Sequence, residues 1–422
     1  MLTLKLLRDD PEYVIRKLAV KHFDAREIVE KVVSLDKNRR DLQKELDSCL
    51  AQQKQKAAQI GSLMKEGKTD EAGRVKEEVA ALKERSRELD AASEKNNEEL
   101  MSQIVLLPNI PCDLVPEGKD SNDNLVVKMG GQMPDLGPDA LPHWELAKKL
   151  DIIDFDLGVK LTGAGFPVYK GKGARLQRAL INMFLDINTG AGYLEVEPPV
   201  MVNEASGFGT GQLPDKEGQM YHANLDNFYL VPTAEVPVTN IYRDVILGEN
   251  DFPVKMTAYT PCFRREAGSY GKDVRGLNRL HQFDKVEIVR IEKPENSYAA
   301  LDDMVAHVEG IVNRLGLPYR ILRLCGGDLS FTSAITYDFE VYSAAQGRWL
   351  EISSVSNFES YQANRLKLRY KDSEGKTQLA HTLNGSSLAL PRVVAALLEN
   401  NQKDGHIIIP EALRQYTGFD MI

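Results

Sequence analysis

A chain of 422 residues is long enough for two or three domains, and its 42% hydrophobic and 27% charged residues are typical of a soluble globular protein. The net charge of −9 argues against a nucleic-acid-binding surface over the whole molecule, and no apolar run approaches the roughly 18 residues of a membrane span. The four cysteines, Cys49, Cys112, Cys262 and Cys325, form no C-x-x-C pair, which argues against a disulfide framework or a structural zinc site and favours a reducing cytoplasm.

Residues 26–107 are almost free of proline and aromatic residues, and their apolar positions recur at steps of mostly three, four or seven. This spacing predicts two helices paired as an antiparallel coiled coil, joined by a turn in the polar stretch KEGKTDEAG. At about 1.5 Å per residue, helices of roughly 35 to 40 residues make an arm of roughly 50 to 60 Å. The two apolar seams are Ile28, Val32, Leu35, Leu42, Leu46, Cys49 and Ile60, and then Ala72, Val75, Val79, Leu82, Leu89, Leu100 and Leu107.

The charge of the arm leaves two functions open. A coiled coil of this kind is often a spacer or a dimerisation element. From Lys37 to Lys68, however, eight Lys or Arg residues stand against four Asp or Glu residues, a local excess expected of an element that contacts a phosphate backbone.

Three prolines in LLPNIPCDLVPEGKDSNDN mark the end of the arm, because helix cannot continue through them. We therefore predict an N-terminal domain over residues 1–107, a linker over 108–120 and a second domain over 121–422. In that domain, strand-like runs such as VEIVRI, TYDFEVY and HIIIP alternate with helical segments such as ARLQRALINMFLDINT and SYAALDDMVAHVEGIVNRLG. This pattern indicates an α/β or α+β body on a mainly antiparallel sheet.

The stretch CFRREAGSYGKDVRGLNRLHQFDKVE contains six cationic and four acidic side chains, and it predicts a strand, a glycine-rich loop and a returning strand. Period-two alternation would place Arg264 and Glu266 on one face of the first strand, and Phe283, Lys285 and Glu287 on one face of the second. The arginine is suited to a phosphate or a carboxylate, the phenylalanine to stacking a purine, and the glutamates to accepting from amino groups. The alternative is a surface hairpin with cross-strand ion pairs.

Two later segments carry further polar groups. In WLEISSVSNF, Glu351 and Ser354 are oxygen ligands suited to Mg²⁺, unless they simply lie on a half-exposed edge strand. In HTLNGSSLALPRVVAALLENNQ, a small-residue turn at residues 384–386 is predicted to lead into an apolar helix with Arg392 near its first turn. That helix start is either an anion site or an ordinary capped entry.

Together these segments resemble class II aminoacyl-tRNA synthetases. CFRRE with its return strand resembles motif 2, LPRVVAALLE resembles motif 3, and TGAGYLEVEPPVMV resembles motif 1, the helix–strand element at the dimer interface of that class. VPTAEVPVTN, EISSVSNFESYQANR and HTLNGSSLALPR extend the similarity, so that the whole chain resembles the seryl-tRNA synthetase family. One departure is Pro391, where small residues are usual before the motif 3 arginine; we expect the first helical turn to tolerate it.

The resemblance implies an α+β fold of class II synthetase type: a mainly antiparallel sheet flanked by helices, with an N-terminal coiled-coil arm. It implies that Arg264, Glu351 and Arg392 are catalytic, with Arg264 bridging the α-phosphate of ATP and the substrate carboxylate, and Arg392 holding the γ-phosphate. Phe283 would stack on adenine and Glu266 would accept from its amino group, while Glu351 and Ser354 would hold Mg²⁺ through ATP. The implied ATP-binding residues are Arg264, Arg265, Glu266, Phe283, Glu351, Ile352, Ser353, Ser354 and Arg392; the implied serine-binding residues are Thr233, Ala234, Glu235, Arg264, Glu287, Asn384 and Ser386.

The implied activity is ATP-dependent activation of serine to seryl-adenylate, followed by transfer to the 3′ end of serine tRNA, and also of selenocysteine tRNA where an organism has one. The arm would bind serine tRNA, and the enzyme would be a cytoplasmic homodimer without a membrane contact. Two alternatives keep the fold: an amino acid:carrier-protein ligase, whose relatives lack the long arm, and an inactive paralogue serving as a binding protein. Loss of Arg264, Glu351 or Arg392 would have been the sign of such a paralogue.

Overall fold

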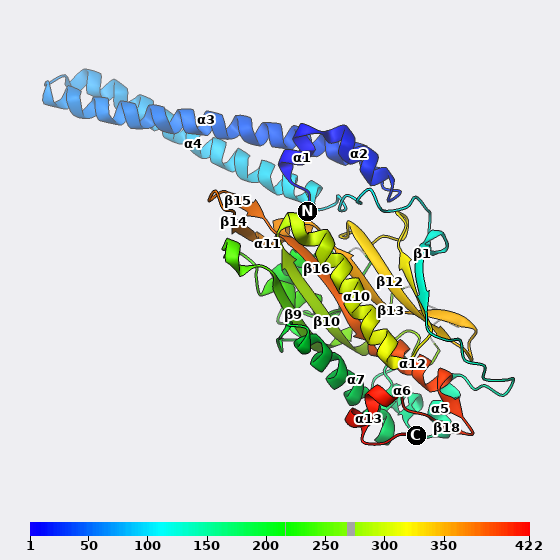
Figure 1. The fold of residues 1–422 in the computed structure, drawn as a ribbon. Helices are drawn as coiled ribbons and strands as arrows, with labels where there is room; N and C mark the ends of the chain where they lie inside the picture. Colours follow the sequence, from blue (N-terminus) through cyan, green and yellow to red (C-terminus); the bar gives the residue numbers. More distant parts are fainter. Residues whose placement is uncertain (216, 268–274) are drawn as a thin grey trace. The chain divides into compact units, whose positions relative to one another are not determined.

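The chain divides into two units, Met1–Ile110 and Pro111–Ile422, in a computed structural model that describes residues 1–215, 217–267 and 275–422 (Figure 1). The division falls inside the segment 108–120 that the prolines mark in the sequence. No helix within the described ranges is long and apolar enough to cross a membrane.

Two long antiparallel helices, α3 and α4, dominate the first unit and confirm the predicted coiled-coil arm. The turn between them is shorter than predicted, since α4 already begins at Thr69 and Gly73 lies inside it. Gly67 adopts a left-handed φ of +77° in the turn. The helices of this unit are α1 (Leu4–Asp9), α2 (Pro11–Ala19), α3 (Arg26–Lys65) and α4 (Thr69–Ile104).

The seam of the arm is apolar with a few polar contacts that set its pairing. Leu46, Cys49 and Leu89 form one buried layer, and Leu63, Ala72 and Val75 form another near the turn. Between α3 and α4, the buried Asn96 Nδ2 donates to the Leu35 carbonyl at 3.0 Å, and Lys31 pairs with Glu99 at 2.8 Å. The Asn96 contact lies in the apolar seam and therefore favours one register of the two helices over others, whereas the Lys31–Glu99 pair is on the surface.

An eight-stranded sheet forms the centre of the second unit, and helices α7, α10 and α12 pack against it (Figure 1). Neighbouring strands are antiparallel, except for β4, which pairs with β9 in parallel. The predicted α+β class with a mainly antiparallel sheet is therefore confirmed. In spatial order the strands are β1 (Leu125–Gly130), β11 (Tyr319–Arg323), β12 (Ile335–Ser343), β13 (Arg348–Asn357), β16 (His381–Ala389), β10 (Gln282–Glu292), β9 (Val254–Phe263) and β4 (Leu194–Glu195).

Helices and small sheets make up the rest of the second unit. The α-helices are α5 (His143–Lys149), α6 (Phe155–Leu161), α7 (Gly171–Gly190), α8 (Glu204–Thr210), α9 (Glu235–Asn240), α10 (Ser297–Leu315), α11 (Ser360–Leu366), α12 (Leu390–Asn400) and α13 (Glu411–Thr417). The small sheets pair β2 (Ile153–Asp154) with β3 (Val168–Tyr169), β17 (Gln402–Lys403) with β18 (His406–Ile407), β5 (Met201–Val202) and β6 (His222–Ala223) with β7 (Phe228–Leu230), and β8 (Ile246–Leu247) and β15 (Thr377–Leu379) with β14 (Arg369–Lys371).

Three local predictions are corrected by these bounds. Residues 384–386 lie inside β16 and form no turn, and β9 ends at Phe263, so Arg264 and Glu266 follow the strand instead of lying on it. Of HIIIP, only His406–Ile407 is a strand. The glycine-rich loop predicted at AGSYGKDVRG falls mostly outside the described residues.

The small residues of β16 have a packing reason. Gly385 faces Val355 on the neighbouring strand, and a Cβ placed on Gly385 would lie 3.1 Å from a Val355 methyl carbon. Short side chains here allow close strand contact, so the composition that resembled a turn belongs to a central strand.

Candidate active site

Three ionisable side chains are buried together where α9 meets β10. Lys285 and Glu287 are two residues apart on β10 and therefore share a face, and Lys285 Nζ lies 2.5 Å from Glu287 Oε2. Lys285 Nζ also donates to Thr233 Oγ1 at 2.8 Å, just before α9. One ammonium thus links the predicted serine-binding residues Thr233 and Glu287.

Glu235, the first residue of α9, adds a second carboxyl group to this cluster. Its Oε1 accepts from Gln362 Nε2 at 2.6 Å. Burial, with a further contribution from the charge of Glu287, raises the pKa of Glu235 to about 7. The cluster therefore holds two carboxyl groups against one ammonium, which suits a ligand that carries a positive charge.

The register of β10 against β16 brings the remaining predicted serine-binding residues to the same place. Glu287 pairs with Ser386, and Val289 pairs with Asn384. A hydrogen bond from the Asn384 side chain to Glu235 partly opposes the rise in its pKa. Ala234 differs from the others, because its side chain packs in an apolar core cluster and only its backbone is left for a substrate.

Arg264 lies one residue beyond β9, next to Phe283. Its guanidinium group is 5.2 Å from the centre of the Phe283 ring, and its Nε donates to the Pro232 carbonyl at 3.3 Å. The backbone N–H of Arg264 still donates to the His281 carbonyl at 2.9 Å, so pairing continues just past the strand. The predicted cation and the predicted stacking ring are therefore adjacent, next to Thr233.

Glu266 and Arg265 follow in the same segment. Glu266 has a left-handed φ of +49° and pairs with Arg279 Nη1 at 2.8 Å, so it is already engaged by a cation. The exposed Arg265 donates its backbone N–H to the Gln219 carbonyl at 2.9 Å.

Glu351 and Ser354 are brought together by a β-bulge in β13. Opposite them, Phe339 pairs with Ser353 whereas Glu340 pairs with Glu351, so Ile352 is the extra residue. In a regular strand residues three apart face opposite sides, but here Ser354 Oγ donates to Glu351 Oε1 at 3.3 Å. The side chain of Ile352 is buried, which leaves its backbone for any ligand contact.

A third oxygen-bearing side chain, Asp338, pairs with Ser354 across the strands. Burial and the neighbouring Glu351 carboxylate raise the pKa of Asp338 above its usual range. Within the part of the chain that the structure describes, the buried Asp338 Oδ1 has no hydrogen-bond partner. The set of hard oxygen atoms, one of them unsatisfied, fits a divalent cation such as Mg²⁺.

Arg392 lies in the first turn of α12, as predicted. Its Nη1 donates to the Glu351 carbonyl at 2.9 Å, and its Nε donates to the Asn278 carbonyl at 2.9 Å. Pro391 lies beside it in the same turn, where a missing N–H breaks no helical hydrogen bond. Ser353 Oγ donates to the Ser386 carbonyl at 2.6 Å, which joins β13 to β16, the strand that carries Asn384 and Ser386.

Sequence reasoning missed several residues of this site. The sequence predicts Lys285 on the same strand face as Phe283 and Glu287 but assigns it no role, and it indicates none of Gln362, Asp338 and Asn278. The alternation of Phe283 with charged residues could have indicated Lys285, and Asn278 lies in the same stretch of sequence. Asp338 and Gln362 are distant along the chain: the pairing of β12 with β13 brings in Asp338, and helix α11 brings in Gln362.

The chain is similar to known proteins over its whole length. The model of the tRNA synthetase class II core domain (G, H, P, S and T) matches residues 219–401, and that of the seryl-tRNA synthetase N-terminal domain matches residues 1–111. The serine–tRNA ligase of Salinibacter ruber is 51% identical over 424 residues, covering 100% of this chain and 99% of the relative. That of Akkermansia muciniphila is 47% identical with the same coverage. The crystal structure of seryl-tRNA synthetase from Pyrococcus horikoshii complexed with ATP superposes with a TM-score of 0.93 at 32% identity, covering 100% of this chain and 99% of that one.

Proposed function

The chain belongs to the seryl-tRNA synthetase family, and on that premise we propose how its residues divide the work of the reaction. The protein is a serine–tRNA ligase that uses ATP. Full-length similarity to enzymes of this name leaves no reason to retain the inactive paralogue or the carrier-protein ligase.

The reaction has two steps. The serine carboxylate attacks the α-phosphorus of ATP and pyrophosphate leaves; a terminal ribose hydroxyl of tRNA then attacks the adenylate carbonyl and AMP leaves. Both reactants of the first step are anions, so the site must offset their repulsion and align them. No side-chain nucleophile is needed for this chemistry.

Arg264 and Arg392 are the cations we assign to the phosphates. Arg264 bridges the α-phosphate and the serine carboxylate, which its position between Phe283 and Pro232 supports. Arg392 binds the γ-phosphate. Adenine stacks on Phe283, and Glu266, with Arg265 and the backbone at Ile352 and Ser353, completes the nucleotide contacts.

Glu351 and Ser354 would hold Mg²⁺, and the unsatisfied oxygen of Asp338 belongs to the residue that pairs with Ser354 on the neighbouring strand. When bound with ATP, Mg²⁺ supplies charge compensation for the phosphates. What the chain itself contributes is the bulge at Ile352, which aligns the two ligand side chains.

Serine is bound by the pocket of Thr233, Glu235, Glu287, Asn384 and Ser386. Two carboxyl groups and several hydroxyl and amide groups can accept from the ammonium and the hydroxyl group of serine. A site built to bond a hydroxyl rejects a substrate without one by about 10⁴-fold, because its own polar groups are left unpaired. Threonine must be kept out by size, since one methyl group is worth only about 1–3 kcal/mol.

The arm is the part we assign to serine tRNA, and its basic first helix supports this. Dimerisation is supported by apolar side chains that are exposed around the segment resembling motif 1: Leu194, Met201 and Phe228. The four free cysteines suit a reducing cytoplasm. Charging of selenocysteine tRNA remains part of the proposal for organisms that have it.

The observation that carries these assignments is the buried pair of carboxyl groups, Glu235 and Glu287, facing one lysine. Amino-acid-dependent ATP–pyrophosphate exchange tests it with serine, threonine, alanine and cysteine. We expect exchange with serine alone. Exchange driven equally by alanine would contradict the pocket assignment, because alanine lacks the hydroxyl group.

A further inference from the structure

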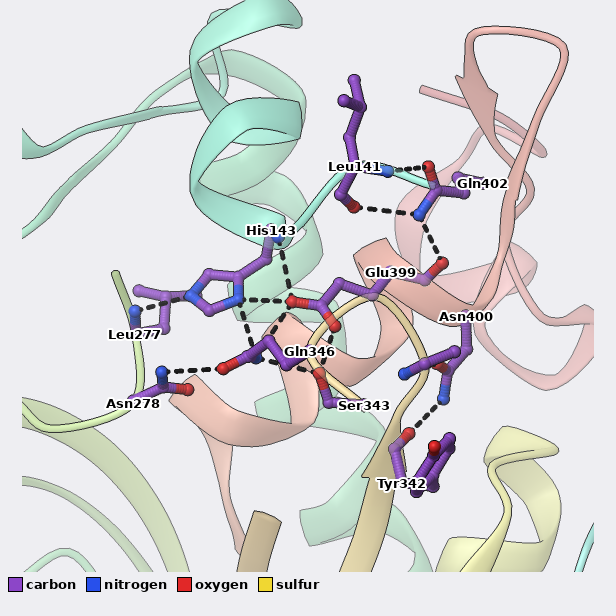
Figure 2. A network of polar contacts seen from close by, with 11 residues as sticks. Leu141, His143, Leu277, Asn278, Tyr342, Ser343, Gln346, Glu399, Asn400 and Gln402 are labelled. Carbon is purple, nitrogen blue, oxygen red and sulfur yellow. Dashed lines mark hydrogen bonds and ion pairs between the residues drawn. The ribbon is translucent and has the colours of Figure 1, made fainter. Parts of the chain in front are cut away.

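A buried polar network joins α5, the segment 275–278, the loop after β12 and α12 (Figure 2). At its centre, His143 Nδ1 and Glu399 Oε1 are 2.7 Å apart, and both side chains are completely buried. Polar groups buried this deeply lower the stability of the fold unless each of them is hydrogen-bonded.

Glu399 accepts hydrogen bonds from four donors. Its Oε1 accepts from the backbone N–H of His143 at 2.9 Å and from Gln346 Nε2 at 3.0 Å as well as from the imidazole, and its Oε2 accepts from Ser343 Oγ. Burial alone would raise the pKa of Glu399, but the hydrogen bonds from His143 and Ser343 outweigh it and hold the pKa below its usual range. Glu399 is therefore a carboxylate, and it orients the imidazole so that Nδ1 donates.

The imidazole of His143 in turn contacts the backbone at Gly276 and Leu277. Its Nε2 accepts from the Leu277 N–H at 2.8 Å. Gly276 has a left-handed φ of +65°, and a Cβ there would overlap the His143 ring, so the backbone approaches the imidazole as closely as glycine allows. Next to His143, the Arg275 guanidinium lies 4.5 Å from the centre of a Trp144 ring. Two side chains of α5, His143 and Trp144, thus contact residues 275–277.

Asn278 links these contacts to Arg392 through two hydrogen bonds. The Asn278 side chain donates to Gln346 Oε1 at 3.0 Å, and the Asn278 carbonyl accepts from Arg392 Nε at 2.9 Å. Arg392 and Glu399 are seven residues apart on α12, two turns along the same side of the helix. Helix α12 therefore contacts residues 277–278 in two ways: Arg392 bonds directly to Asn278, and Glu399 acts through His143, which bonds to Leu277.

We propose that His143 and Glu399 are positioning residues for ATP: they fix the Asn278 carbonyl, which in turn aims the Arg392 guanidinium at the triphosphate. This inference rests on the proposed role of Arg392. Arg392 itself has its Nη1 on the Glu351 carbonyl, so its Nε contact to Asn278 is the second of two points that define the plane of the guanidinium. Without that second point the group can rotate about the first.

The test is the Michaelis constant for ATP, compared with that for serine, in pyrophosphate exchange. We expect His143→Ala and Glu399→Ala to raise the KM for ATP about tenfold while the KM for serine stays within about twofold, because the misplaced cation belongs to ATP alone. Glu399→Gln keeps an acceptor for His143 and should restore most of the affinity for ATP. His381→Ala is the control, since His381 is a half-buried histidine, bonded to Ser297 Oγ at 2.8 Å, outside this network.

A merely structural network would give another pattern. His143→Ala and Glu399→Ala would then lower the thermal midpoint and the active fraction, as the loss of a histidine in His381→Ala does, and would raise neither Michaelis constant more than the other. That result would overturn the proposal. If His143→Ala and Glu399→Ala do not fold, Gln346→Ala decides, because it removes the contact to the Asn278 side chain from the half-buried end of the network. A rise of about threefold in the KM for ATP supports the proposal and no rise overturns it.

Arg392→Ala is measured in parallel, because it tests the role of Arg392 in ATP binding separately from its positioning by His143 and Glu399. A large loss of ATP affinity in that variant, without one in the network variants, would refute the positioning role alone. No loss in Arg392→Ala would refute the assignment of Arg392 on which the inference rests.

Discussion

The charges of the proposed serine pocket predict what single substitutions there will do. Glu235 and Glu287 share one buried cation, Lys285, so the pocket is one negative charge in excess whenever both glutamates are ionised. In our proposal the ammonium of serine would supply the missing positive charge. Removing either carboxylate should therefore act on serine affinity first, and this can be separated from an effect on folding.

Glu287→Ala should lower kcat/KM for serine about 100-fold or more, because truncating one partner of a buried charge pair costs about 2–5 kcal/mol. The matched control is Glu292→Ala. Glu292 lies on the same strand, is equally buried and pairs with Arg290, two residues before it, at 2.5 Å, as Glu287 pairs with Lys285. Pyrophosphate exchange and thermal unfolding of both variants make the comparison. Equal losses of exchange activity would show that Glu287 is structural.

Glu235 should make serine binding depend on pH. Its pKa of about 7 in the free enzyme exceeds the ordinary value, so the folded protein holds a proton there that a bound ammonium would displace. As the pH falls below about 7, serine must compete with that proton, and the KM for serine should rise about tenfold per pH unit; above 7 it should level off. The KM for Mg²⁺-bound ATP should stay flat over the same range.

The sign for stability is the reverse of the usual carboxylate case. Between the ordinary pKa of glutamate and about 7, the folded state binds the proton and the unfolded state does not, so Glu235 makes the free protein less stable as the pH rises through this window. Glu235→Gln should remove both the slope in serine KM and this contribution to unfolding. A serine KM that is independent of pH in the unaltered protein would contradict the role of Glu235.

At the scale of single elements, the bulge in β13 shows what pairing adds to sequence. Glu351 and Ser354 are three residues apart, and alternation alone would point them to opposite sides of the sheet. The two-against-one pairing at Ile352 turns them to the same side. Nothing in the local sequence indicates a bulge, because its cause is the register with β12.

The arm was the easiest element to predict from sequence. Its apolar seams repeat over many turns, so helices and their pairing follow from local pattern. Residues 384–386 were the hardest, because small polar residues are typical of turns and only the two neighbouring strands make them a strand. The network around Glu399 lay beyond prediction for the same reason: His143, Leu277 and Gln346 come from three distant segments, and no spacing links them.

Opposite charges on the two helices of the arm lead to a prediction about α3. Residues 37–68 carry an excess of four positive charges, whereas α4 has six Lys or Arg against ten Asp or Glu. Replacing the exposed Lys44 and Lys54 together by alanine should raise the KM for tRNA about tenfold and reduce its dependence on salt concentration, by about one unit of log–log slope per lost phosphate contact. The control is the same double change at Lys76 and Lys83, which are exposed on α4. An equal effect of both pairs would point to overall charge rather than to a binding face.

At the scale of the whole molecule, the chain consists of two units with separate internal contacts. All residues assigned to ATP and serine lie in Pro111–Ile422, whereas the basic helix belongs to Met1–Ile110. Adenylate formation should therefore be independent of the far part of the arm, and transfer to tRNA should not be. This division can be tested without disturbing either helix base.

The arm can be shortened at a layer where its helices are fixed to each other. Asn96 bonds to the Leu35 carbonyl and Lys31 pairs with Glu99, so removing residues 40–92 and joining the ends with a short glycine–serine turn keeps both contacts. We expect serine-dependent pyrophosphate exchange within about twofold of the intact enzyme. We expect a loss of tRNA charging of about 100-fold or more, because the deletion removes the basic part of α3 that we propose contacts the phosphate backbone. Unchanged thermal unfolding of the second unit shows that the shortened chain is folded. Charging that survives the deletion would make the arm a spacer, and loss of exchange together with charging would mean that the two units do not act separately.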